Sequence, residues 1–120
     1  MTLLLSLFVA AGLLLIALSL PLIWGKVGPN LWYGFRVRRT LRDPAVWYPA
    51  NAFAGKCLLY VGLAIAAAAV LFYFVPGIDV EGYARVVAVV ALVGAAITVA
   101  LSLRYLATVD RRSNGADEDR

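Results

Sequence analysis

Residues 3–24 read LLLSLFVAAGLLLIALSLPLIW and contain no charged side chain. An α-helix needs about 20 mostly apolar residues to cross the roughly 30 Å hydrocarbon core of a bilayer. Residues 58–75 and 86–103 are two further windows without charge. A helix pairs all its backbone amides within one segment, which lipid requires. The sequence therefore predicts an all-α integral membrane protein with three transmembrane helices, over about residues 3–24, 54–75 and 84–105.

The composition supports the same fold class. Hydrophobic residues make up 63% of the 120 residues, against roughly 45–50% in soluble proteins. One domain of this size cannot bury so much apolar surface, so part of it must face lipid. The alternative for the first window is a secretory signal peptide. Met1 and Thr2 carry no basic side chain, however, and residues 18–24 offer no small-residue cleavage site.

The basic residues predict the orientation in the membrane, because cytoplasmic loops carry an excess of Lys and Arg. The second connection, residues 76–82, contains Asp79 and Glu81 but no basic residue. Most of the basic residues lie in the first connection and after the third span: Lys26, Arg36, Arg38, Arg39, Arg42, Arg104, Arg111 and Arg112. We therefore expect the N-terminus outside, and the loop of residues 25–51 and the C-terminus in the cytoplasm.

Aromatic residues are expected to mark the two membrane surfaces, because Trp and Tyr favour the headgroup level. One group surrounds the basic loop: Trp24, Trp32, Tyr33, Trp47 and Tyr48. The other lies at the opposite end: Phe72, Tyr73, Phe74 and Tyr83. Residues 1–112 are expected to form one membrane domain. The polar, acid-rich segment 113–120 is predicted to be a disordered tail.

The basic loop is the most informative part of the chain, because helix hairpins usually need only about 2–8 residues. Asp43-Pro44 predicts a helix start, with Asp as the cap and Pro at the first helical position. Pro49 then predicts a kink between a surface turn of helix and the second span. The alternative is that Pro49 itself begins the span and Asp43-Pro44 is only a turn.

The loop resembles the signature of the SdpI family of bacterial membrane proteins. The residues that carry the resemblance are Pro29, Asn30, Trp32, Tyr33, Gly34, Phe35, Arg36, Thr40, Leu41, Asp43, Trp47, Asn51, Gly55 and Lys56. It implies a polytopic protein of the bacterial plasma membrane. The family's namesake gives immunity to a membrane-active killing peptide and holds a transcriptional repressor at the membrane. That protein has an additional membrane-spanning half, whereas this chain resembles a short form carrying the shared module.

Candidate binding residues follow from this loop, and they are expected to contact a partner or lipid: Asn30, Trp32, Gly34, Arg36, Arg38, Arg39, Thr40, Asp43, Trp47 and Asn51. Arg36 is the first candidate, because a guanidinium matches a carboxylate or phosphate. Its other interpretations are a headgroup anchor, or a pair with Asp43 or Asn51 that organises the loop. Small residues of the spans are expected to pack helices closely, namely Gly62, Ala66, Ala67, Gly94, Ala95 and Thr98.

No catalytic, cofactor-binding or metal-binding residue is predicted. The chain has no histidine, no paired carboxylates and no phosphate-binding glycine loop. Cys57, the single cysteine, excludes a disulfide within the chain. We expect a non-enzymatic protein of immunity or signalling that binds membrane lipid and a cytoplasmic repressor, without direct contact to nucleic acid. The alternatives are a small accessory subunit of a larger membrane complex and an anionic-lipid-binding envelope protein; a homo-oligomer remains open.

Overall fold

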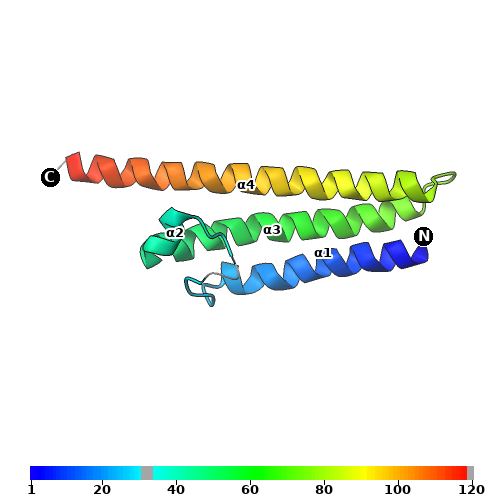
Figure 1. Ribbon diagram of the computed structural model, residues 1–120, viewed down its shortest axis with the longest axis horizontal. Helices are drawn as coiled ribbons and strands as arrows, with labels where there is room; N and C mark the ends of the chain where they lie inside the picture. Colours follow the sequence, from blue (N-terminus) through cyan, green and yellow to red (C-terminus); the bar gives the residue numbers. More distant parts are fainter. Residues whose placement is uncertain (31–33, 119–120) are drawn as a thin grey trace.

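Three long helices and one short helix make up the computed structural model (Figure 1). It describes residues 1–30 and 34–118, apart from the side chains of residues 38, 39, 113, 114 and 116–118. The helices are α1 (Thr2–Ile23), α2 (Arg38–Arg42), α3 (Pro44–Tyr73) and α4 (Val80–Glu118). The described residues form no strand, and α1, α3 and α4 are long and apolar enough to cross a membrane. This confirms the predicted fold class, while the orientation stays a prediction.

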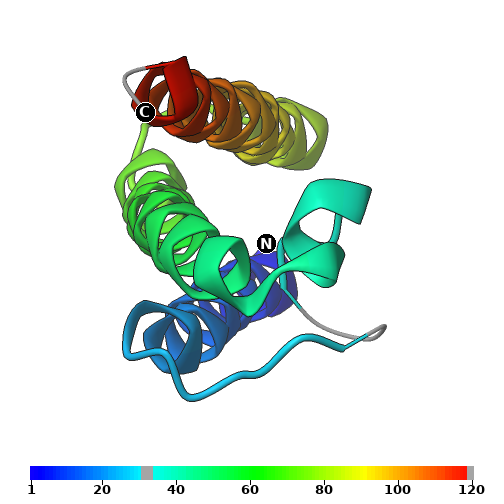
Figure 2. The same ribbon diagram turned by 90° about the vertical axis from the view of Figure 1, so that its left-hand side faces the viewer.

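Helix α3 lies between the other two long helices and packs against both (Figures 1 and 2). Glycines let α1 and α3 approach closely. A Cβ atom on Gly12 would lie 2.7 Å from the carbonyl oxygen of Gly62, and a Cβ atom on Gly62 would lie 2.7 Å from that of Gly12. Gly94 of α4 similarly faces the side chain of Val61 at 3.0 Å. The expected packing role is thus confirmed for Gly62 and Gly94, whereas Ala67 and Ala95 are exposed.

At the end away from the basic loop, the three long helices share an apolar cluster. Ile65 and Ala69 of α3 pack with Tyr83 and Val87 of α4, and Phe8 of α1 joins them. The Tyr83 hydroxyl donates to the carbonyl of Ala69 at 2.8 Å. Tyr83 was expected at the membrane surface, but its side chain is fully buried because this hydrogen bond satisfies the hydroxyl inside the protein.

Helix α3 begins at Pro44, which confirms the predicted start. The Asp43 carboxylate accepts a hydrogen bond from the Ala45 amide at 3.0 Å. The helix continues through Pro49, so the alternative start at Pro49 is wrong. Pro49 removes the partner of the Ala45 carbonyl. Both residues are exposed near the helix start, where water can replace the lost bond.

Helix α4 extends well beyond the predicted end of the third span near residue 105. It continues to Glu118, and so runs through residues 113–118, where the sequence predicted a disordered tail. No proline interrupts residues 80–118, and Ala, Leu, Arg and Glu, which form helices readily, make up nearly half of them. Figure 1 shows the C-terminal part of α4 projecting past the basic loop.

Candidate functional site

The basic loop folds against the first turns of α3 and against α4, at one end of the helix bundle (Figure 2). Phe35 and Val37 of the loop pack against a cluster formed by Val46, Ala50 and Leu106. Phe35 and Val37 therefore contact both of the long helices that follow the loop in the chain.

Trp47 anchors the first half of the loop. Its indole N–H donates to the carbonyl of Val27 at 2.7 Å, and its side chain is fully buried. Trp47 was expected at the headgroup level, where an indole is half in water. The loop covers it instead, whereas Trp24 and Tyr48 are exposed and match that expectation.

Asn51 anchors the second half of the loop. Its side-chain oxygen accepts from the Phe35 amide at 2.5 Å, and its NH₂ group lies 3.4 Å from the Phe35 carbonyl. The NH₂ group also donates to the Trp47 carbonyl at 3.0 Å. One buried amide thus pairs with both backbone groups of Phe35, much as a neighbouring strand would.

Gly34 is required beside this amide. Its φ of +111° is a backbone conformation that side chains disfavour. A Cβ atom there would also lie 2.6 Å from the side-chain oxygen of Asn51. The glycine lets the chain turn and lets Asn51 reach the Phe35 amide.

Thr40 closes the turn that precedes α3. Its buried hydroxyl lies 2.8 Å from the Phe35 carbonyl and 2.9 Å from the Val37 carbonyl, and it accepts from the Val37 amide at 3.1 Å. Thr40 belongs to α2, a short helix that the sequence did not predict. Asn30 stabilises its own turn in the same way, with its NH₂ group donating to the Gly28 carbonyl at 2.8 Å.

Trp47, Asn51 and Gly55 follow one another at intervals of four, which places them on one face of α3. All three are buried, and each contacts a different segment. Trp47 holds Val27, Asn51 holds Phe35, and Gly55 lies against α1, where a Cβ atom would meet the Ser19 carbonyl at 3.1 Å. This face of α3 organises the loop.

Among the charged candidates, Asp43 is half-buried and caps α3, whereas Arg36 is exposed. The side chains of Arg36 and Arg42 are exposed, as are those of Lys26 and Lys56 at either end of the loop region. Lys26 lies over the Trp24 ring, 5.5 Å from its centroid. The pairing of Arg36 with Asp43 or Asn51 stays a prediction.

The remaining candidates lie outside what the structure describes. These are Trp32, and the side chains of Arg38 and Arg39. The backbone of residues 38 and 39 forms the first turn of α2.

The sequence analysis did not identify the backbone groups to which the loop's hydrogen bonds are made. It singled out the side chains of Trp47 and Asn51 but not the Val27 carbonyl or the Phe35 amide. The signal available was the polar amide of Asn51 close to an apolar span, because a buried amide needs partners.

Comparison with known proteins identifies the family of this chain. The SdpI/YfhL protein family matches residues 26–103, which include the basic loop, α3 and most of α4. The chain belongs to the SdpI/YfhL family. This confirms the resemblance seen in the loop signature.

A curated relative supports the same family. The chain is 34% identical over 58 residues to the uncharacterized protein YfhL of Bacillus subtilis (strain 168), which covers 48% of this chain. The chain spans about half, 53%, of the length of that relative. No solved structure matches the chain. Family membership and three apolar helices make it a multi-pass membrane protein, and a bacterial plasma membrane agrees with the relative's source.

Proposed function

We propose that this SdpI/YfhL family protein is a non-enzymatic membrane protein that presents its basic loop to an acidic cytoplasmic partner. In this proposal the N-terminus lies outside the cell and the loop lies in the cytoplasm. The partner is a soluble regulator of transcription, and its capture serves immunity to a membrane-active peptide or a related signal.

One observation carries the proposal: buried side chains hold the described part of the loop in place, and exposed cations lie on it. Buried Trp47, Asn51 and Thr40 tie the loop backbone to α2 and α3, while Arg36 and Arg42 are exposed. A preordered surface loses less conformational entropy when a partner binds.

The distribution of charge supports the cytoplasmic location. Arg104, Arg111 and Arg112 of α4 follow the apolar window, at the same end of the bundle as the loop (Figure 1). The opposite end carries Asp79 and Glu81 together with Arg85, which pairs with Glu81. Cations gathered at one end favour the cytoplasmic side and would attract an acidic protein surface.

The test is a mild-detergent pull-down of tagged protein from its own cells, followed by mass spectrometry. It compares wild type with Arg36→Ala and with Arg85→Ala. Arg85 is a matched control, because its exposed side chain lies near the opposite end of the bundle and pairs with Glu81 at 3.3 Å. We expect a soluble DNA-binding protein with wild type and Arg85→Ala, and its loss with Arg36→Ala.

Two other outcomes would refute the proposal. Recovery of one integral membrane complex with all three proteins would identify an accessory subunit. Equal recovery of the regulator with all three would mean that Arg36 does not contribute to the binding surface.

A further inference from the structure

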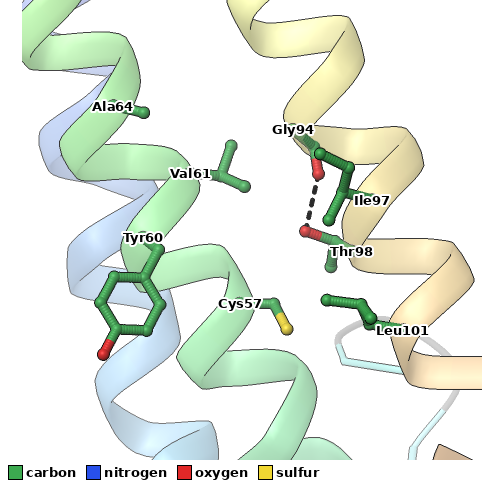
Figure 3. A pocket seen from close by; sticks show the side chains of 8 residues that line it. All are labelled: Cys57, Tyr60, Val61, Ala64, Gly94, Ile97, Thr98 and Leu101. Atoms are coloured by element: carbon green, nitrogen blue, oxygen red, sulfur yellow. Dashed lines mark hydrogen bonds between the residues drawn. The ribbon is translucent and has the colours of Figure 1, made fainter.

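A groove lies between α3 and α4, at residues 57–64 of α3 and 94–101 of α4, in the loop-side halves of the spans predicted over residues 54–75 and 84–105 (Figure 3). Its volume is about 320 Å³, within the range of about 300–1,000 Å³ typical of small-molecule sites. The side chains that form its walls are Cys57, Val61 and Ala64 from α3, and Ile97, Thr98 and Leu101 from α4. The Thr98 hydroxyl donates to the Gly94 carbonyl at 2.8 Å, so the groove offers an apolar surface.

The groove is closed at both ends. Towards the loop, the rings of Phe53 and Tyr105 stack with their centroids 4.8 Å apart. Deeper in the membrane, Ile65 and Val87 belong to the buried cluster that holds α3 against α4. The α3 part of the groove, residues 57–64, is about 10 Å long at 1.5 Å per residue.

This length fits a lipid chain better than another helix. One leaflet contributes about half of the roughly 30 Å hydrocarbon core, and a crossing helix contacts its partner through most of that thickness. A groove of about 10 Å on the loop side of the bilayer would hold most of the roughly 15 Å that one acyl chain spans in that leaflet.

Two cations follow the groove residues along α3 and α4 towards the loop. Lys56 is one turn from Tyr60, which lines the α3 side, and Arg104 is one turn beyond Leu101 on α4. Residues three and four apart share a helix face, so both cations follow the groove towards the membrane surface. Both side chains are exposed.

We propose that the α3–α4 groove binds one anionic phospholipid from the leaflet on the loop side. The acyl chain lies along Val61 and Ala64, and the phosphate lies between Lys56 and Arg104. This site is separate from the surface that Arg36 and Arg42 form, and it does not depend on the proposed regulator.

Native mass spectrometry of the full chain in detergent tests the site. The probes are dioleoyl phosphatidylglycerol, which is anionic, and dioleoyl phosphatidylcholine, which has the same chains and no net charge. We expect one phosphatidylglycerol per protein. Each basic residue contributes about a fivefold preference, so Lys56→Gln combined with Arg104→Gln should weaken phosphatidylglycerol binding about 30-fold. Phosphatidylcholine binding should fall less, because its choline group neutralises the charge of its phosphate.

A second pair of variants tests the groove itself. Ala64→Phe fills it and should remove binding of both lipids. Ala100→Phe is the control, because Ala100 is exposed on α4 outside the groove. Equal phosphatidylglycerol binding by wild type and the double Gln variant would overturn the proposal, as would unchanged binding by Ala64→Phe. A dimer that Ala64→Phe converts to monomer would assign the groove to a second copy.

Discussion

Asn51→Ala should release the basic loop from α3 without disturbing the membrane spans. The substitution removes the acceptor of the Phe35 amide, which lies in the part-buried contact between loop and helix. A buried amide without a partner costs about 1–3 kcal/mol. The lost bond from the Asn51 NH₂ group to the Trp47 carbonyl adds roughly 0.6 kcal/mol, the average for side-chain bonds in a membrane protein. We expect the loop to open more easily by about 2 kcal/mol.

Trypsin measures this opening directly, because the loop contains Arg36 and Arg42 as cleavage sites. When opening is fast, the cleavage rate follows the population of the open form. A change of about 2 kcal/mol corresponds to cleavage about 30-fold faster. Cleavage after Arg111 and Arg112, near the C-terminus of α4, gives an internal reference rate that should not change.

Ser102→Ala is the matched control. Ser102 is as buried as Asn51, and its side chain lines a small cavity together with Gly34 and Phe35. Among the described residues its hydroxyl has no hydrogen-bond partner, so its removal breaks no bond. If Asn51→Ala were cleaved within twofold of Ser102→Ala, the amide would not hold the loop and our account of the site would be wrong.

Two further substitutions test other contacts. Trp47→Phe removes the hydrogen bond to the Val27 carbonyl, a loss of about 1 kcal/mol. Trypsin cleavage after Lys26 should therefore become about fivefold faster. The control Trp24→Phe changes an exposed indole and should be cleaved at the wild-type rate. Gly62→Ala places a Cβ atom 2.7 Å from the Gly12 carbonyl and should destabilise the α1–α3 contact by about 1–3 kcal/mol. A lower thermal midpoint in detergent would show this, and no change relative to Ala67→Val, on an exposed surface, would contradict it.

The spans and the start of α3 could be predicted because they depend on local sequence. A charge-free window is sufficient for a membrane helix, and Asp43-Pro44 contains both the cap and the first helical residue. The C-terminal end of α4 could not be predicted, since the mostly polar residues after Leu103 are compatible both with a continued helix and with a disordered segment. Helix propensity is a weak guide there, because contacts with water and lipid also decide whether the helix continues.

The loop could not be predicted, because its contacts join residues far apart in the chain. The bond from Asn51 to Phe35 spans 16 residues, and that from Trp47 to Val27 spans 20. Composition placed Trp47 at the membrane surface, since an indole near basic residues usually lies there. Its burial follows from the loop covering it, which only the three-dimensional arrangement specifies.

The spacing of Trp47, Asn51 and Gly55 gives the family signature a physical meaning. These residues lie on one face of α3, and each fixes a different segment: the start of the loop, its centre, and α1. Variants at these positions should therefore act by changing the loop's shape, and trypsin should detect them. Variants of exposed Arg36 change the charge displayed on that loop without breaking the hydrogen bonds of Trp47 or Asn51. A variant that no longer binds the proposed regulator, while its loop stays resistant to trypsin, would show that the loop's charge and not its fold had been changed.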